Sequence, residues 1–514
     1  MIEVVTREVG GSPLVRAARA GTLPESWYAA LPANPTAWTM AARHVAEEFA
    51  NRDWYTATAA ACAARGRDAE RMIRVAEGRG IVVTTGQQPG LFGGPIYTWS
   101  KAFTALTLAD EIERCTGIPT APVFWAATDD ADYAEASYTT VIRAGEVYEL
   151  RLPARDSGLA MSALALGDVS AQYDTLVETA GSAIDPSPLE AIRDAYVPGQ
   201  TVGGAYVTLL RTLLEPFGIA VLDASHPAVR VAAAPTVRQA LHRAPIVRDA
   251  LIERSRAIEG AGYRVQVQPV SHLSLVFRAG ADGRRSRIPV KEAAEVALAA
   301  TDTELGPNVL LRPVVERQIL PTVTYVAGPA EFAYFAQVSA VADALTCPRP
   351  RVVPRWSGLL LEPHVRNILL EVDATIDDFR DPHAVERRVA RAELPPDVRD
   401  ALQSLRDAVA TQATVLHNVD DDVVAPLHKA VDGFALQVDH RITRLERRYA
   451  AAVKRTGTAR LRQVALARAS LFPRGVPQER ALNILPFWAR YGGLLCDKMI
   501  VAAASHARRV ISDD

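Results

Sequence analysis

Residues 81–95 read IVVTTGQQPGLFGGP, and this stretch decides the fold class. Residues 81–85 form a short run rich in β-branched side chains that ends at a glycine, which predicts a buried strand. A glycine-rich turn follows and leads to Pro95, which suits the first turn of a helix that we expect to run to about Arg114. The apolar run 122–127 predicts a second strand. A strand, helix and strand in this order imply parallel pairing with a right-handed crossover.

The same alternation of strands and helices recurs further along the chain. A helix near 204–216 leads into an apolar run at 219–223, and a run at 322–326 precedes a helix at 330–345. Residues 351–354 predict a further strand. This alternation indicates a doubly wound α/β sheet.

Two segments between these units look antiparallel instead. They are 139–152, which turns at Ala144 and Gly145, and 263–290, which turns at 280–283. With a helix near 187–196, we interpret them as insertions that form a smaller α+β lobe. The division expected from the whole chain is N-terminal helices and the first half of the core in 1–135, an insertion lobe in 136–200 and 258–305, the second half of the core in 201–257 and 306–360, a helical coiled-coil region in 361–460, and helices returning to the core in 461–514.

Composition narrows the class of protein. With 514 residues, about three domains are expected, and 49% hydrophobic with 23% charged residues is ordinary for a globular protein. The 57 basic and 59 acidic residues give a charge of −2, which argues against nucleic acid as a partner. The four cysteines lie far apart without a CxxC pair, which suits a reducing compartment. We find neither a membrane span nor a signal peptide, so we expect a cytoplasmic protein.

The chain beyond about residue 360 is predicted to be helical. Eight apolar residues recur there with heptad-like spacing, which favours a coiled coil and a homodimer formed through it. They are Leu427, Val431, Phe434, Val438, Ile442, Leu445, Tyr449 and Val453. Leu402, Leu405 and Val409 would supply the other arm of a helical hairpin. The alternative is an ordinary long amphipathic helix packed on the core.

Ligands in open parallel sheets bind beyond the carboxyl ends of the strands. After the first predicted strand stand Gly86, Gln87 and Gln88, and then the glycine-rich turn. Its backbone N–H groups and the positive end of the following helix would suit a phosphate or carboxylate, which Lys101 would also reach. The alternative is a tight connection that binds no ligand.

After the second predicted strand stand Asp129, Asp130 and Asp132. Three carboxylates within four residues repel one another unless a cation binds them, so they are candidates for holding an amine, a metal ion or an arginine. The alternative is a capped, solvated loop.

A third candidate group surrounds the strand at 322–326, and we expect it to form the other wall of the same cleft. Its members are Asn308, Arg312, Gln318, Tyr325, Gly328, Glu331, Tyr334 and Gln337. Glu331 has the alternative of serving only as a favourable partner for a helix dipole.

Common cofactor and catalytic motifs are absent from the sequence. It contains no GxGxxG, GxxxxGK[ST], GxSxG or HExxH, and its ten histidines do not pair at the spacing of metal ligands. No metal site is therefore predicted.

Four long motifs carry a resemblance to a known family. They are VVTTGQQPGLFGGPIYTWSKAF (82–103), PVFWAATDDADYAE (122–135), NVLLRPVVERQILPTVTYVAGPAEFAYFAQ (308–337) and LFPRGVPQERALNILPFWARYG (471–492). In this order they resemble the bacillithiol synthase family, the cysteine-adding enzymes of bacillithiol biosynthesis. The resemblance runs from about residue 80 to the C-terminus.

The resemblance implies a Rossmann-like core similar to class I synthetases, with insertions and a coiled-coil region. It also implies ligation of L-cysteine to glucosaminyl malate. Forming an amide normally requires an activated carboxylate, which makes ATP a candidate co-substrate, although the HIGH and KMSKS motifs of class I aminoacyl-tRNA synthetases are absent. The chain also departs from the family, which usually has histidines where this sequence has Ala131 and Tyr138.

The site predicted from these features has three parts. The first part holds an anionic group and comprises Gly86, Gln87, Gln88, Gly90, Gly93, Gly94, Tyr97 and Lys101. The second binds the amine of cysteine or of the sugar and takes its proton; it comprises Asp129, Asp130 and Asp132. Asn308, Arg312, Tyr325, Gly328 and Glu331 complete the cleft. The alternatives are a divergent paralogue that binds ligands or assembles without this chemistry, which the two missing histidines favour, and a synthetase-like RNA-binding protein, which the balanced charge disfavours.

Overall fold

The computed structural model describes residues 1–8, 10–155, 158–381, 383–419 and 427–512, and these form two compact units. The larger unit comprises Ile2–Val141, Tyr148–Leu360 and Glu479–Asp514. The smaller unit comprises Leu361–Gln478 with Met1 and Ile142–Val147. Each is described separately.

The larger unit is built on a five-stranded sheet in the order β11-β10-β2-β3-β6, in which every pairing is parallel. The strands are β2 (Ile81–Gln87), β3 (Thr120–Ala126), β6 (Ala220–Asp223), β10 (Thr322–Ala327) and β11 (Val352–Pro354). The chain passes from β2 outward to β3 and β6 and then returns to the other side of β2 as β10 and β11. The predicted doubly wound α/β sheet is therefore confirmed, and its order reverses between β2 and β10.

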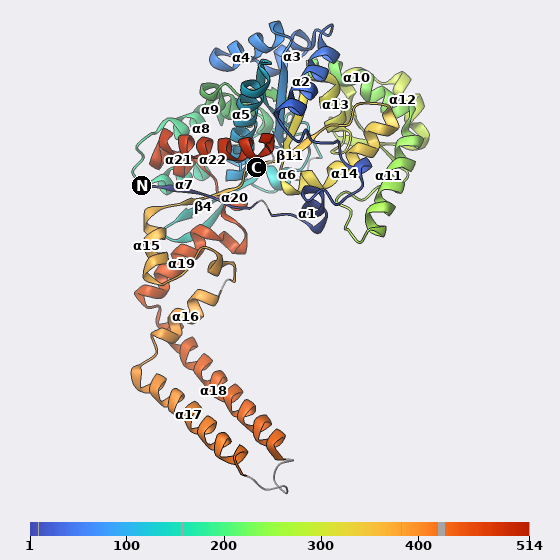
Figure 1. Ribbon diagram of the computed structural model, residues 1–514. Coiled ribbons are helices and arrows are strands. Elements are labelled where there is room, and N and C mark those ends of the chain that lie inside the picture. The colour runs from blue at the N-terminus through green and yellow to red at the C-terminus, as the bar shows by residue number, and fades with distance from the viewer. Residues whose placement is uncertain (9, 156–157, 382, 420–426, 513–514) are drawn as a thin grey trace. The chain divides into compact units, whose positions relative to one another are not determined.

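Helices cover this sheet (Figure 1). They include α1 (Pro13–Arg19), α2 (Pro35–Phe49), α3 (Trp54–Cys62), α4 (Gly66–Glu77), α5 (Ile96–Thr116), α9 (Val202–Leu214), α10 (Pro227–His242), α11 (Ala244–Gly260), α13 (Arg312–Ile319), α14 (Pro329–Leu345), α21 (Leu485–Tyr491) and α22 (Gly493–Ser512). One buried apolar cluster joins β2 and β3 to α2 and α5, and another joins α14 to α10, α11 and α13. The helix predicted after the glycine turn is α5, and Gly117 ends it in the left-handed conformation with φ +70°.

The insertions contain the predicted antiparallel elements. β4 (Tyr138–Arg143) and β5 (Glu146–Arg151) pair across a two-residue turn, and α7 (Ser170–Ala180) and α8 (Ser187–Ala195) follow. β7 (Leu273–Ala279) pairs antiparallel with β8 (Arg285–Pro289) and with β9 (Leu305–Pro307), and α12 (Ala293–Ala299) lies between these two in sequence. The prediction of strand from residue 263 was wrong for 263–272. The side chain of Gln337 hydrogen-bonds both backbone groups of Val267, which a neighbouring strand would otherwise pair.

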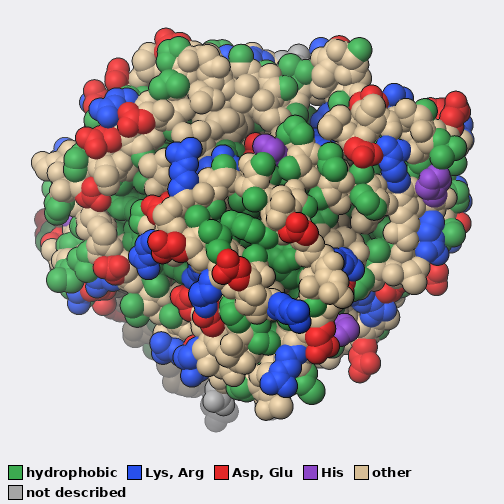
Figure 2. Space-filling view, turned by 90° about the horizontal axis from the view of Figure 1, so that it is seen from above, with side chains coloured by type: hydrophobic (Ala, Val, Ile, Leu, Met, Phe, Trp, Pro, Cys, Tyr) green, Lys and Arg blue, Asp and Glu red, His purple; other side chains and the backbone are tan. Residues whose placement is uncertain are grey.

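Short elements complete the larger unit. β1 (Glu3–Thr6) pairs with β12 (Gly358–Leu361), α6 (Tyr133–Ala136) follows β3, and α20 (Gln478–Ala481) precedes α21. The face in Figure 2 carries basic and acidic side chains interspersed with one another, in keeping with the balanced charge. In the part of the chain that the structure describes, no helix is long and apolar enough to cross a membrane.

The smaller unit is helical, as predicted. It contains α15 (Pro363–Glu371), α16 (Ala384–Ala392), α17 (Pro396–His417), α18 (His428–Thr456) and α19 (Ala459–Leu471). α17 and α18 lie side by side as the predicted hairpin (Figure 1), joined by an ion pair of 2.8 Å between Arg406 and Glu446. The buried carboxylate of Glu386 ties α16 to α18 and α19 through Lys454 and Arg468.

Candidate functional site

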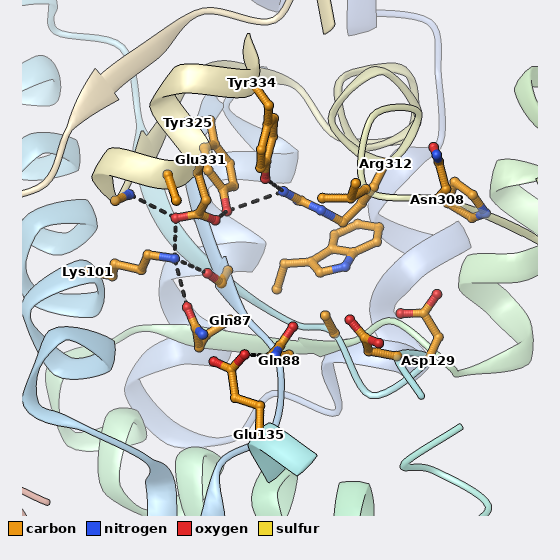
Figure 3. Close-up of a pocket in the computed structure, with 18 of the residues that line it drawn as sticks. Gln87, Gln88, Lys101, Asp129, Glu135, Asn308, Arg312, Tyr325, Glu331 and Tyr334 are labelled. Carbon is orange, nitrogen blue, oxygen red and sulfur yellow. Dashed lines mark hydrogen bonds and ion pairs between the residues drawn. The ribbon is translucent and has the colours of Figure 1, made fainter. Parts of the chain in front are cut away.

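A cavity of about 450 Å³ lies at the carboxyl ends of β2, β3 and β10. This is the edge where the strand order reverses, the usual position for a ligand in a doubly wound sheet. Among the predicted site residues, twelve line it: Gly86, Gln87, Gln88, Tyr97, Lys101, Asp129, Asp130, Asn308, Arg312, Tyr325 and, at the start of α14, Gly328 with Glu331. Figure 3 shows Gln87, Lys101, Arg312 and Glu331 among the side chains that line it.

Lys101 is buried and fully partnered. Its Nζ donates to the carbonyl oxygen of Gly86 at 2.7 Å and to Oε1 of Gln87 at 2.9 Å, and it forms an ion pair with Glu331. Burial lowers the pKa of Lys101, and the negative charge of Glu331 opposes this effect. Because all three N–H bonds have protein acceptors, the geometry gives Lys101 a positioning role rather than the predicted contact with an anion.

Glu331 caps α14 and is also the partner of Lys101. It accepts hydrogen bonds from the backbone N–H of Gly328 at 2.8 Å and from the Tyr325 hydroxyl at 2.7 Å. The ion pair and these hydrogen bonds keep the pKa of Glu331 below its ordinary value despite burial. Its position at a helix N-terminus therefore accounts for only part of its contacts.

Arg312 leads to a buried carboxylate that sequence reasoning missed. Its guanidinium donates to Glu316 at 2.7 Å and to the hydroxyls of Tyr325 and Tyr334 at 3.3 and 3.4 Å. Glu316 also accepts a hydrogen bond from Thr84 on β2. Burial raises the pKa of Glu316 to about 7, although the charge of Arg312 opposes the rise. Glu316 lies one helical turn after Arg312 on α13, and this spacing, which is typical of an ion pair on one helix face, could have identified it from the sequence.

The three aspartates do not form the single cluster that was predicted. Asp129 pairs with Arg285 at 3.5 Å, and Asp130 lines the cavity beside it. Burial raises the pKa of Asp130, and the charge of Asp129 adds to the rise. Asp132 is exposed and caps α6 by accepting the backbone N–H of Glu135 at 3.1 Å. The capped-loop alternative is therefore correct for Asp132, and within the described ranges no group of acidic, histidine or cysteine side chains is arranged to hold a metal ion.

Glu135 is a cavity carboxylate that sequence reasoning did not select. It accepts hydrogen bonds from the Gln88 side chain and, at 3.4 Å, from the hydroxyl of Tyr97. Burial raises the pKa of Glu135, and so do the charges of Asp132 and Asp130. Among described residues it has no ion-pair partner, so it is suited to a cationic ligand. Glu135 follows Asp132 by three residues, which is the spacing of a helix cap and an acidic residue in the first turn. This spacing could have identified Glu135 from the sequence.

The glycine turn does not offer the donors that were predicted. The N–H of Gly93 bonds to the carbonyl oxygen of Gly90 at 3.1 Å, and that of Gly94 bonds to Leu91 at 3.2 Å. These three glycines lie outside the main cavity; Gly90 and Gly94 line a side pocket of about 40 Å³ next to it. The turn therefore closes on itself, and its Gly93 and Gly94 N–H groups are not directed at an anion.

Asn308 lies at the cavity but uses its side chain for local structure. Its Oδ1 accepts the N–H groups of Leu310 and Leu311, both at 3.1 Å, in the turn before α13. Gln318 and Gln337, which the sequence placed on this wall, lie outside the cavity.

Three arginines complete the lining and were not predicted. Arg285 comes from β8, Arg355 follows β11, and Arg480 comes from α20. Arg355 pairs with Glu479 through two bonds of 2.7 and 2.8 Å. Arg480 is exposed and has no hydrogen bond or ion pair with any residue that the structure describes. The cavity thus holds an unpaired cation as well as the carboxylates of Asp130 and Glu135.

Ala131 and Tyr138, where the resemblance implies histidines, differ in their surroundings. Ala131 lines the main cavity, so a histidine there would face the ligand. Tyr138 lines the side pocket instead, and the guanidinium of Arg151 lies 4.6 Å from the centre of its ring.

Two family models together match most of the chain. The model "Bacillithiol biosynthesis BshC, N-terminal Rossmann-like domain" matches residues 53–356. The model "Bacillithiol biosynthesis BshC, C-terminal coiled-coil domain" matches residues 358–510. The first contains the sheet and most of the cavity, and the second contains the helical hairpin.

Named relatives are similar to this chain over most of its length. The chain is 33% identical over 442 residues to the protein named "Putative cysteine ligase BshC" of Koribacter versatilis, which covers 82% of each chain. It is 31% identical over 451 residues to the protein of that name in Solibacter usitatus, covering 84% of each chain. For the Salinibacter ruber protein the values are 30% over 444 residues, with 82% of this chain and 80% of the relative.

Proposed function

The chain belongs to the BshC family of bacillithiol biosynthesis, and from this membership we propose that it is a ligase joining L-cysteine to glucosaminyl malate. The product would be bacillithiol, formed in the cytoplasm. The observation that supports this reaction is the composition of the cavity. Asp130 and Glu135, two carboxylates with no ion-pair partner in the described part of the chain, suit the amines of the two substrates, and Arg480, equally unpaired there, suits a carboxylate.

The chemistry requires an activated carboxyl group. In the proposed sequence, a carboxylate oxygen of cysteine attacks the γ- or α-phosphorus atom of ATP and displaces ADP or pyrophosphate, respectively. The sugar amine then attacks the acyl carbon, the C–N bond forms, and the acyl–oxygen bond to the phosphorus-bearing group breaks. Asp130 accepts the proton that the amine loses. A buried carboxylate with a raised pKa is a stronger base than an exposed one, which suits this role.

The start of α14 is the part of the cavity that best suits a phosphate. Gly328 lines the cavity at the N-terminal end of this 17-residue helix, whose dipole favours an anion; its own N–H is already bonded to the Glu331 carboxylate. Arg355 lies beside it, and its buried Nε has no hydrogen-bond partner among the described residues. These features support ATP as the activating co-substrate, whereas the glycine turn does not.

A divergent paralogue without ligase activity is the second candidate function. It is favoured by Ala131, which places a methyl group in the cavity where the related family usually has a histidine. In that case the cavity would bind substrates without joining them.

One assay separates the two candidates. The purified protein is incubated with L-cysteine and glucosaminyl malate, with and without ATP, and the thiol products are identified by mass spectrometry. Formation of bacillithiol that depends on ATP is the expected result. If no product forms while calorimetry detects binding of glucosaminyl malate, the paralogue is correct and the ligase proposal fails.

A further inference from the structure

The side pocket next to the main cavity contains an unusual hydroxyl group. Thr98 on α5 is 1% exposed, and its Oγ1 has no hydrogen-bond partner among the residues that the structure describes. Two other threonines of the same helix, Thr104 and Thr107, donate to the carbonyl oxygens of Ser100 and Phe103. A buried hydroxyl without a partner is unfavourable, so a ligand atom in this pocket would supply what the protein does not.

Two glycines keep this pocket open. A Cβ atom on Gly94 would lie 3.3 Å from Thr98 Oγ1, and one on Gly90 would lie 2.8 Å from the Cα of Gly94. Gly94 also has φ +73°, a conformation that other residues rarely adopt. The space that these glycines leave is about 40 Å³, which is room for about three water-sized groups.

The lining of the side pocket carries two opposite charges. Glu135 and Arg480 line both the side pocket and the main cavity, and neither has an ion-pair partner among the described residues. The hydroxyl of Tyr97 donates to Glu135 at 3.4 Å, and Tyr97 lines both cavities as well. An ammonium and a carboxylate on one carbon atom, as in an amino acid, match this pair of charges.

We propose that the side pocket receives the short side chain of the amino-acid substrate, with Thr98 hydrogen-bonded to its terminal group and with Glu135 and Arg480 holding its ammonium and carboxylate. This inference rests on the proposed function, because it assigns the place where L-cysteine binds. The methylene and thiol of cysteine match the volume, whereas a branched side chain such as that of leucine exceeds it. Thr98 is then a residue that determines specificity.

Direct binding tests this assignment without requiring ligation. The full-length protein is titrated calorimetrically, in a reducing buffer, with L-cysteine, L-serine, L-alanine and L-leucine. We expect cysteine and serine to bind about 3- to 10-fold more tightly than alanine, the usual effect of one neutral hydrogen bond, and leucine not to bind. Thr98→Val keeps the shape of the side chain and removes the hydroxyl. It should bring cysteine and serine to the affinity of alanine.

A matched control is available on the same helix. Thr107→Val removes a buried hydroxyl that lies outside the side pocket, and it should leave all four affinities unchanged. Because the Thr98 hydroxyl has no partner, Thr98→Val should unfold at a temperature at least as high as the wild type. Glu135→Gln and Arg480→Gln should each weaken binding of all the short amino acids alike.

The outcomes separate this inference from the proposed function. If leucine binds as well as cysteine, if Thr98→Val preserves the order of affinities, or if no amino acid binds, the side-pocket assignment is overturned, whether or not the ligation assay forms product. If the order holds and Thr98→Val abolishes it, the pocket stands even when the ligation assay forms no bacillithiol, and only the proposed reaction fails.

Discussion

The ammonium of Lys101 on α5 and the carboxylate of Glu331 on α14 form a buried ion pair, which links the helices that follow β2 and β10 (Figure 3). Their side chains are 3% and 19% exposed. The pair lies at the edge where the strand order reverses, so it holds together the two walls of the cavity. The ion pair therefore acts mainly on the shape and stability of the cavity.

Replacing Lys101 with Met should destabilise the protein strongly. The change leaves the Glu331 carboxylate buried without its cation, which typically costs about 3–5 kcal/mol in the free energy of unfolding. Urea denaturation measures this loss. In Lys101→Met/Glu331→Gln, which removes both charges, part of the stability should return.

Lys291→Met is the matched control for this prediction. The Lys291 side chain is 82% exposed, so its replacement should change the free energy of unfolding by less than about 0.5 kcal/mol. A Lys101→Met protein as stable as the control variant would show that the ion pair is unimportant.

The buried carboxyl of Glu316 should make stability depend on pH. Its pKa of about 7 in the folded protein exceeds the value near 4.5 of an exposed glutamate, so the folded state binds the proton more tightly than the unfolded state. Its contribution to stability is therefore largest at low pH and is lost as pH rises from about 4.5 to 7, by about 3 kcal/mol in total.

The comparison of wild type with Glu316→Gln isolates this contribution. Gln does not titrate and keeps the shape of the side chain; its one oxygen can accept from Arg312, and its amide can donate to the Thr84 hydroxyl. The difference in free energy of unfolding between the two proteins should fall from pH 5 to pH 8 and then remain constant. A difference that is independent of pH over this range would mean that Glu316 stays ionised throughout.

The sequence predicted the elements of the sheet because their signals are local. The strand expected at 81–85 is Ile81–Gln87, and the helix expected at 330–345 is Pro329–Leu345. Apolar β-branched runs and glycine stops depend on neighbouring residues only. The type of sheet could also be predicted, because parallel strands joined by helices form doubly wound sheets.

The cavity could be predicted only in part, because its remaining residues meet through the tertiary fold. Arg285 and Arg480 come from segments far from β2 in sequence, and no local pattern connects them with Glu135. The local pattern of the turn around Gly94 was also a misleading signal. Its glycines suggested an anion site, yet Gly94 has φ +73° and its N–H is bonded within the turn. A Gly94→Val variant would strain the backbone, so it is not a clean test of ligand binding.

The hairpin of α17 and α18 should form a homodimer. Along the predicted heptad positions of α18, Ile442 is 7% exposed, but Phe434 is 62% exposed and Leu445 is 42% exposed. Such apolar side chains on a helical surface need a partner surface. Sedimentation at micromolar concentration should therefore give twice the chain mass of 55.5 kDa.

Charge placed on the hairpin should break the dimer. Phe434→Glu/Leu445→Glu should sediment as a monomer while keeping its helical content. Leu298→Glu is the control, because Leu298 is 80% exposed on α12, away from the hairpin, and the change should leave the dimer intact. A wild-type protein that sediments as a monomer contradicts the prediction.

Gly328→Ala should weaken ATP binding without unfolding the protein. The added Cβ would lie 3.4 Å from Glu331 Oε2 and 3.7 Å from Lys101 Cε, which are ordinary contacts, and it would occupy the start of α14. If a phosphate binds at this helix end, the methyl group should lower its affinity about tenfold. Calorimetry with a non-hydrolysable ATP analogue measures the change, and equal affinity for both proteins would place the nucleotide elsewhere.

Asp130→Asn should lower the rate of ligation while preserving the fold. Asp130 lines the cavity, and its raised pKa arises mainly from burial, with repulsion from Asp129 as a further cause. Removal of one acid–base group usually costs about 10²–10⁴ in turnover. In the wild type the rate should fall as pH drops through the pKa of Asp130, because the base must be ionised, and the residual activity of Asp130→Asn should lack this dependence. Ala131→His, which restores the residue usual in the family, should keep or raise activity. If Asp130→Asn has unchanged turnover across pH 6–9, Asp130 is not the base.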